Sequence, residues 1–375
     1  MLDRVITGFK QEGLEDLVSK MKVQGQDTVN PTKKVEIKGE YKKFEYAFYL
    51  PVWLMVNKKK NSKRRFSYDF DIRPFIDFHT YFITDDLLEK INSSLSDENR
   101  EQKAFSVSIN DQSETAIAEE THESEFNGFV SKSYMTRRFS EVIDNSFLAR
   151  KVCNDAIDKL VESVGLQKLS EHFSFITSLI TKDLKAVRIR QEENIFTNHL
   201  QEDKLELAIS DDKSIGYKIP TTETITSTSI PNTYSKNLYS DVEVATMNGL
   251  EKSVASILEN QEKLLWWFRN RVGKDWYAIQ GWHKHKIRPD FVAAKKEDDE
   301  TVKVLYIIES KGEHLSGNPD TVYKKKVMDE MTRLMKDGKL VAYQTKFDFA
   351  ALNESVESYL IEENKEKEEL KRLMK

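Results

Sequence analysis

Two stretches of sequence decide the fold of this chain: Lys286-Ile-Arg-Pro-Asp290-Phe-Val-Ala-Ala294 and Val302-Lys-Val-Leu-Tyr-Ile-Ile-Glu309-Ser-Lys311. Both are largely apolar, and the charged residues 295–300 between them favour a turn, so the pair predicts an antiparallel β-hairpin. Alternate residues of a strand point to the same face, so Glu309 and Lys311 share one face. Antiparallel pairing around the turn brings Asp290, which opens the first strand, beside Glu309.

These three side chains suggest a reaction. Two adjacent carboxylates repel each other unless they share a cation, and oxygen ligands of this kind suit Mg²⁺. A lysine two positions further along, Lys311, can orient or deprotonate a water and stabilise charge on a phosphate. A metal ion, two acids and a lysine are the parts needed to hydrolyse a phosphodiester.

The flanking sequence predicts a mixed α/β architecture. Apolar residues at helical spacing over residues 244–258 predict a helix, and residues 264–268 and 275–280 predict short strands. A second helix is expected over residues 322–335 and a final strand over residues 340–343. This order of elements suits a sandwich of helices on a mixed sheet.

Pro289-Asp290, eighteen intervening residues and then Glu309-Ser310-Lys311 resemble the motif of the PD-(D/E)xK nuclease superfamily. The segments Trp266-Trp-Phe-Arg-Asn270 and Ile308-Glu-Ser-Lys-Gly312 are more specifically similar to the carboxy-terminal nuclease region of type III restriction enzyme Res subunits. The resemblance implies a restriction-endonuclease-like sandwich preceded by a mixed β and helical accessory domain. It also implies that Asp290, Glu309 and the carbonyl of Ser310 bind Mg²⁺, for which Mn²⁺ can substitute, and that Lys311 serves the attacking water.

The superfamily often adds an acid from the helix before the sheet. Glu251 is the candidate for this role, and Glu243 and Glu259 are further options. Asn248 lies three residues before Glu251, and this spacing also fits a helix capping box. Both interpretations of Glu251, catalytic and capping, stay open at this point.

The function implied by the resemblance is hydrolysis of double-stranded DNA by an endonuclease module of a type III restriction-like or phage-defence system. Relatives join this module to an ATP-driven translocase, but this sequence has neither a GxxxxGK[ST] loop nor an Asp-Glu-x-His box. No ATP site is therefore expected. A helicase or translocase portion and a methyltransferase or specificity subunit are the expected partners. The alternative is a catalytically silent nuclease-fold subunit that binds nucleic acid or scaffolds such a complex.

Charge is distributed unevenly along the chain. The 58 basic and 63 acidic residues give a net charge of −5, which does not indicate a nucleic-acid-binding protein. Residues 269–296, however, contain eight bases and two acids, so a basic face is expected there. The candidate phosphate-binding residues are Arg269, Arg271, Lys284, Lys286 and Arg288.

Several other features have a structural and a functional interpretation. Lys324 to Lys326 could join the phosphate-binding group or cover a solvated helix face. The basic residues 58–65 are interpreted as a solvated turn rather than a phosphate contact. The aromatic residues between 266 and 282 fit a core better than a base-stacking platform. His283, His285 and His314 make a poor zinc set.

The length of 375 residues suggests about two domains. We expect an accessory region over residues 1–210, with strands near 44–56 and 66–70 followed by helices over 139–164 and 173–196. A linker rich in Ser and Thr is expected at 211–238, the nuclease domain at 239–350, and a charged helix or tail at 351–375. Cys153, the single cysteine, is expected to be buried in a helix. No apolar run approaches the roughly 20 residues of a membrane span, so a cytoplasmic protein without a membrane partner is expected.

Overall fold

The computed structural model describes residues 32–96, 130–226, 234–273, 275–297, 301–312, 318–343, 346 and 356–374. Over these residues the chain is a mixed α/β protein, as predicted. Its main sheet has the strand order β12-β10-β9-β8. The strands are β8 (Leu264–Arg269), β9 (Phe291–Lys296), β10 (Val302–Lys311) and β12 (Val356–Glu362).

The predicted hairpin is confirmed. β9 and β10 pair antiparallel with Ile308 opposite Phe291, so Asp290 and Glu309 occupy level positions at the open end of the hairpin. β12 continues the sheet parallel to β10. Strand β8 pairs antiparallel with the other side of β9.

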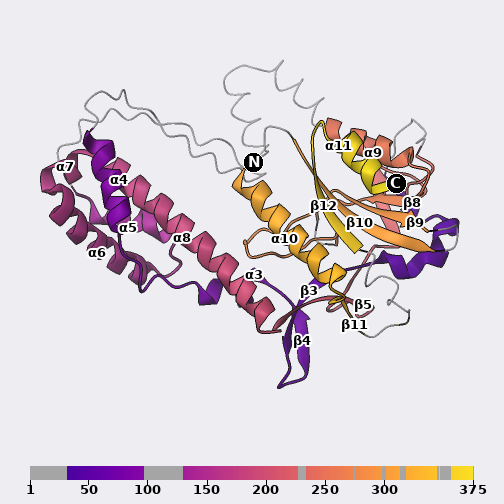
Figure 1. Ribbon diagram of the computed structural model, residues 1–375, viewed down its shortest axis with the longest axis horizontal. Coiled ribbons are helices and arrows are strands. Elements are labelled where there is room, and N and C mark those ends of the chain that lie inside the picture. Colours follow the sequence, from indigo (N-terminus) through magenta and orange to yellow (C-terminus); the bar gives the residue numbers. More distant parts are fainter. Residues whose placement is uncertain are drawn as a thin grey trace, which may run out of the picture.

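Helices cover both faces of the main sheet (Figure 1). On one face, α9 (Gly249–Glu259) and α11 (Glu366–Met374) pack over a core that includes Tyr306 and Ile308. On the other, α10 (Pro319–Lys336) packs over a core that includes Leu305 and Ile307. Burial on both faces explains why β10 is an almost continuous apolar run instead of an alternating one.

A second sheet carries the amino-terminal strands, in the order β11-β5-β3-β4. Two further pairs are β1 with β7 and β2 with β6. The strands are β1 (Thr32–Glu36), β2 (Tyr49–Leu50), β3 (Val52–Asn57), β4 (Ser62–Arg65), β5 (Leu205–Ser210), β6 (Tyr217–Lys218), β7 (Thr222–Thr226) and β11 (Val341–Tyr343).

The two sheets share one hydrophobic core. The rings of Phe48 and Trp266 lie 5.8 Å apart, and the hydroxyl of Tyr277 donates to the carbonyl of Pro51 at 2.6 Å. The strands at the amino-terminal end therefore pack on the main sheet and do not form a separate accessory domain. The boundary predicted at residue 210 is wrong in this respect.

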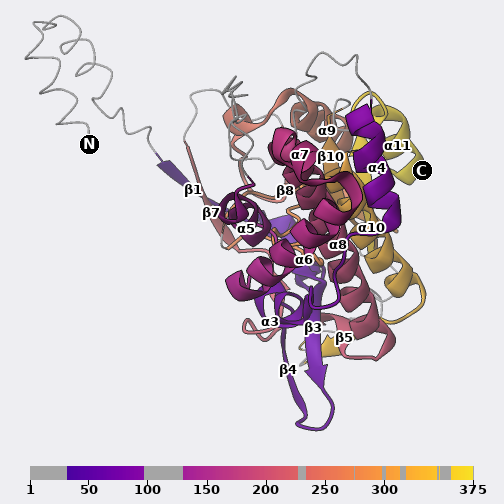
Figure 2. The same cartoon turned by 90° about the vertical axis from the view of Figure 1, so that its left-hand side faces the viewer.

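A helical lobe extends from this body (Figures 1 and 2). It has its own apolar core, in which Cys153 is buried as predicted. The long helix α8 starts in the lobe and reaches the main core, where Phe196 contacts Trp53 and Trp282. The helices of the lobe are α4 (Asp85–Ser96), α5 (Lys132–Ser140), α6 (Ser146–Val164), α7 (Leu166–Glu171) and α8 (Phe173–Gln201).

The predicted linker and tail are corrected. The linker range contains β6 and β7, and Leu238 within it is fully buried. The range 351–375 contains β12, an edge strand of the main sheet, and α11, whose Leu370 is also fully buried. Polar and charged side chains outnumber apolar ones in both segments, so composition alone did not reveal that these segments belong to the packed fold.

Several local predictions are also corrected. Residues Gly39–Phe48 form the 3₁₀ segment η1, which is kinked at Phe44, and Tyr41, Phe44 and Ala47 are buried at a spacing of three instead of two. Tyr68–Asp71 is helix α3, followed by η2 (Arg73–Phe75), where a strand was expected. The range 275–280 contributes only an isolated bridge between Ile279 and Ile287. The final strand, β11, forms but pairs with β5 in the second sheet.

Within the described part of the chain, none of the helices has the length and apolar character needed to cross a membrane.

Candidate active site

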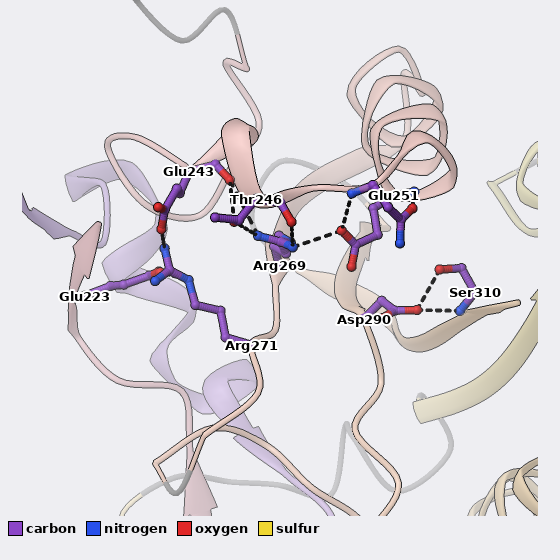
Figure 3. Close-up of polar contacts among 9 residues, drawn as sticks. Glu223, Glu243, Thr246, Glu251, Arg269, Arg271, Asp290 and Ser310 are labelled. Carbon is purple, nitrogen blue, oxygen red and sulfur yellow. Dashed lines mark hydrogen bonds and ion pairs between the residues drawn. The ribbon is translucent and has the colours of Figure 1, made fainter. Parts of the chain in front are cut away.

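Asp290 lies at the open end of the hairpin, directly before β9. Its Oδ2 accepts hydrogen bonds from the backbone N–H of Ser310 at 2.7 Å and from the Ser310 hydroxyl at 2.6 Å (Figure 3). Burial and the negative charges of Glu309 and Glu251 together raise the pKa of Asp290 to about 7, against the two Ser310 hydrogen bonds, which lower it. Asp290 is therefore a carboxyl group in surroundings with an excess of negative charge.

Glu309 and Lys311 are paired with each other and are almost completely buried. Glu309 Oε1 lies 3.3 Å from Lys311 Nζ and 3.1 Å from Lys324 Nζ, which reaches in from α10. Both lysines also approach Asp320, at 3.8 and 3.3 Å. Burial opposes the charge on Lys324, but Glu309 and Asp320 outweigh it and raise the pKa of Lys324.

One oxygen of this cluster has no partner. Glu309 Oε2 is buried without a hydrogen bond among the described residues. A buried carboxylate oxygen without a partner has lost its hydrogen bonds to water, and a bound cation or a hydrogen-bond donor would offset that free-energy cost.

The sheet divides the candidate site into two sides. Ser310 lies on the same face of β10 as Tyr306 and Ile308, which face α9, and its hydroxyl donates to Asp290. Glu309 meets Lys324 on the side of α10. Glu309 and Lys311 therefore lie on the side of α10, whereas Asp290 takes its hydrogen bonds from Ser310 on the side of α9; all three residues lie at the same end of β9 and β10.

Glu251 lies beside Asp290, at the start of α9. Together with Asn248 it forms a complete capping box, which confirms the capping interpretation. Its Oε2 also accepts from Arg269 Nη2 at 2.9 Å (Figure 3). Glu251 and Asp290 both line a cavity of about 290 Å³. The cap thus fixes Glu251 at the place where a catalytic acid was predicted, and a catalytic role remains a prediction.

The two further acid candidates differ in position. Glu243 lines the same cavity and accepts a hydrogen bond from Arg271 at 2.8 Å. Glu259 lies at the far end of α9, where it accepts from the backbone of Ser235 and from the indole N–H of Trp267. Burial raises the pKa of Glu259, but these hydrogen bonds outweigh it and lower the pKa overall. Glu259 therefore links α9 to the backbone at Ser235 and to Trp267 of β8, and it does not line the cavity.

The five predicted phosphate-binding residues fall into two groups. Arg269, Arg271 and Arg288 line the cavity, whereas Lys284 and Lys286 are exposed outside it. Lys325 and Lys326 of α10 pair with Asp329 and Glu193, each at 2.6 Å.

The cavity arginines are held by internal partners that the sequence did not indicate. Arg269 donates to Glu251 and to Thr246, and Arg271 pairs with Glu223 at 2.5 Å and with Glu243 (Figure 3). Their charges are thus largely balanced by carboxylates. Arg288 instead donates to the carbonyl of Gly273 at 2.6 Å.

Glu223 should make stability depend on pH. Burial and the negative charge of Glu243 together raise its pKa to about 7, against the opposing positive charge of Arg271. Between pH 4.5 and 7 the folded state then keeps a proton that the unfolded state releases, so stability falls as pH rises through this window. We expect the free energy of unfolding to drop by about 1–3 kcal/mol more between pH 5 and pH 8 in the wild type than in Glu223→Gln, measured by urea unfolding. Parallel pH profiles of the two proteins would mean that Arg271 keeps Glu223 ionised throughout.

The tryptophan and histidine residues singled out in the sequence differ in burial. Trp266 and Trp267 are completely buried, which confirms the core interpretation. His283 stacks on Tyr323 with ring centroids 3.8 Å apart, and burial lowers its pKa to about 4. His285 is exposed, and His314 lies outside the described residues.

Across the described residues, no three or more His, Cys, Asp or Glu side chains are grouped as a metal site. No family model, curated protein or solved structure matches this chain.

Proposed function

We propose that this chain is a Mg²⁺-dependent endonuclease module of the PD-(D/E)xK superfamily, which hydrolyses DNA phosphodiester bonds in a type III restriction-like or phage-defence system. The observation that carries the proposal is the position of Asp290 and Glu309 at the same end of a buried hairpin, where the charge of Glu309 raises the pKa of Asp290 and Lys311 lies 3.3 Å from Glu309. Helices on both faces of the sheet are consistent with the sandwich that this superfamily implies.

The chemistry of the side chains fits a hard divalent cation. Asp290 and Glu309 would hold Mg²⁺ or Mn²⁺ through carboxylate oxygens, with the Ser310 carbonyl as the further ligand that the motif implies. Two observations support this fit: Glu309 Oε2 is buried without a partner among the described residues, and the pKa of Asp290 is raised to about 7 by burial and by neighbouring carboxylates. The bound ion would supply Lewis-acid activation of the phosphodiester and of a water.

The surrounding side chains would bind and orient the substrate. Lys311 would hold the attacking water and stabilise charge on the phosphate, and Lys324 brings a second ammonium group to the same carboxylate. Arg269 is held by Glu251 and Thr246, but Arg288 lines the cavity beside Asp290 and donates only to the carbonyl of Gly273 among the contacts described, so its other N–H groups could hold a phosphate.

One observation favours the alternative, a silent nuclease-fold subunit. Two lysines already neutralise Glu309, so the cluster of Glu309, Lys311 and Lys324 could serve as a buried ion pair without a metal. Metal-dependent cleavage distinguishes the two functions.

The test incubates supercoiled plasmid with the full chain and Mg²⁺ or Mn²⁺, with bis(p-nitrophenyl) phosphate as a second substrate that needs no translocation. We expect nicked and linear plasmid, cleavage that stops with EDTA and resumes when metal is restored, and no product with Glu309→Gln. Hydrolysis of neither substrate above the Glu309→Gln background would contradict the proposal and favour the silent subunit.

The two roles of Glu251 can be separated by substitution. Glu251→Gln keeps a side chain that can complete the capping box but removes the negative charge beside Asp290. We expect cleavage to fall about a hundredfold, the low end of the general range for a positioned acid or base, while stability changes by less than about 1 kcal/mol.

Asn248→Ala is the matched control for Glu251→Gln. It removes the cap and should cost about 1 kcal/mol of stability while cleavage is retained. Equal cleavage by Glu251→Gln and wild type would restrict Glu251 to capping.

A further inference from the structure

The strands β3 and β4 form a basic hairpin that projects from the body of the protein (Figures 1 and 2). Between residues 57 and 66 it carries six bases and no acid. The bases are Lys58, Lys59, Lys60, Lys63, Arg64 and Arg65. Its six-residue strand β3 is about 20 Å long at the usual rise per residue.

The tip of the hairpin carries the charge that is available to a ligand. Lys59 and Lys60 are exposed, and their side chains have no hydrogen bond or ion pair among the described residues. Lys58 lies 3.5 Å from Asp203, but both side chains are mostly exposed, so this pair contributes little. Lys63 and Arg64 are engaged with Tyr343 and Asp71.

The base of the hairpin leads to the cavity. Arg65 donates to the carbonyls of Ile215 and Gly216, which fixes its guanidinium at the body of the protein. Tyr217, the residue after Gly216, has its ring 5.1 Å from the ring of Tyr277, and the N–H of Tyr277 donates to Asn270, which lines the cavity. Lys286 is exposed two residues before Arg288. Arg288 in turn lines the cavity with Asp290. Positive charges therefore run from the hairpin to the candidate carboxylates.

We propose that this hairpin is a nucleic-acid-binding arm, whose tip holds the phosphate backbone of a duplex that runs along Arg65, Lys286 and Arg288 to Asp290. A row of like charges is unfavourable by itself, and an anionic ligand with regularly spaced charges offsets that repulsion. A two-stranded β-ribbon also fits the major groove of a duplex, and a length of about 20 Å covers about six base pairs. The choice of nucleic acid as the ligand rests on the proposed function.

The experiment measures binding separately from cleavage. The full chain is titrated in EDTA against a fluorescent DNA duplex of about 30 base pairs, and anisotropy is followed over a series of salt concentrations. The test variant replaces Lys58, Lys59 and Lys60 by Ala. The matched control replaces three exposed lysines of the helical lobe, Lys151, Lys159 and Lys168, by Ala.

We expect the hairpin variant to bind at least about tenfold more weakly and to reduce the slope of log K against log salt by about two to three, since each phosphate contact contributes about 0.9. The control should bind as the wild type does, and all three proteins should melt at the same temperature. Absence of DNA binding by the wild type, or equal affinity and salt slope for the two variants, would overturn the proposal that the hairpin binds nucleic acid. Hairpin-dependent binding to phosphatidylserine vesicles with no binding to DNA would also overturn it and assign the hairpin to membranes.

The outcomes for the arm and for the proposed function can be told apart. Hairpin-dependent DNA binding without any metal-dependent cleavage would support the arm while the nuclease proposal fails. Metal-dependent cleavage, together with DNA affinity that is unchanged in the hairpin variant, would leave the nuclease proposal in place and contradict the proposed arm.

Discussion

Replacing Asp290 by Asn or Glu309 by Gln is expected to lower metal-dependent DNA cleavage by about a hundredfold or more while the protein stays folded. Both substitutions keep the shape of the side chain and remove one buried negative charge. In Asp290→Asn, the amide side chain would still offer an oxygen to the Ser310 N–H and hydroxyl that now bind Asp290. Initial rates of plasmid nicking and urea unfolding curves, measured on the same preparations, separate loss of chemistry from loss of fold.

Lys311→Ala should have an effect of similar size, since it removes the ammonium group that lies 3.3 Å from Glu309. The matched control is Asp329→Asn, an exposed carboxylate of α10 that pairs with Lys325 and lies away from the cluster. It should cleave at the wild-type rate. Cleavage that persists unchanged in Asp290→Asn, Glu309→Gln and Lys311→Ala would show that the hydrolytic site lies elsewhere.

Leu370→Ala is expected to lower the free energy of unfolding by about 2–4 kcal/mol, the cost of a large-to-small change in a packed core. Leu370 is completely buried among α9, α11 and the main sheet. Its neighbour Lys371 is exposed, so Lys371→Ala should change stability by less than about 0.5 kcal/mol. Equal unfolding midpoints for the two variants would mean that the last helix is a solvated tail, as its composition suggested.

The hairpin at the centre of the fold was predictable because its determinants are local. Two apolar runs flank a charged turn, and the alternation of strand residues places Glu309 and Lys311 on one face. The helices α6 and α8 of the lobe were predictable because their apolar residues repeat at helical spacing, whereas α4, α7 and the break at residues 141–145 were not predicted. Glu251 could be located as a cap, since the capping box is a pattern of neighbouring residues.

Features that depend on contacts distant in sequence were missed. The shared core rests on pairs such as Phe48 with Trp266, which no local pattern connects. The same holds for β11, which pairs with β5 more than a hundred residues away. Arg271 was predicted to bind phosphate, but Glu223, 48 residues earlier, takes up part of its charge. Composition marks a residue as charged, and only the fold determines which partner neutralises it.

A cation shared by Asp290 and Glu309 is tested most directly by calorimetric titration of the full chain with Mg²⁺ at pH 8, where a carboxyl group with a pKa of about 7 is ionised. We expect saturable binding by the wild type and by Asp329→Asn, and at least about tenfold weaker binding by Asp290→Asn and by Glu309→Gln. Mg²⁺ binding that is absent from the wild type, or equally tight in all four proteins, would contradict the claim that Asp290 and Glu309 hold a common cation.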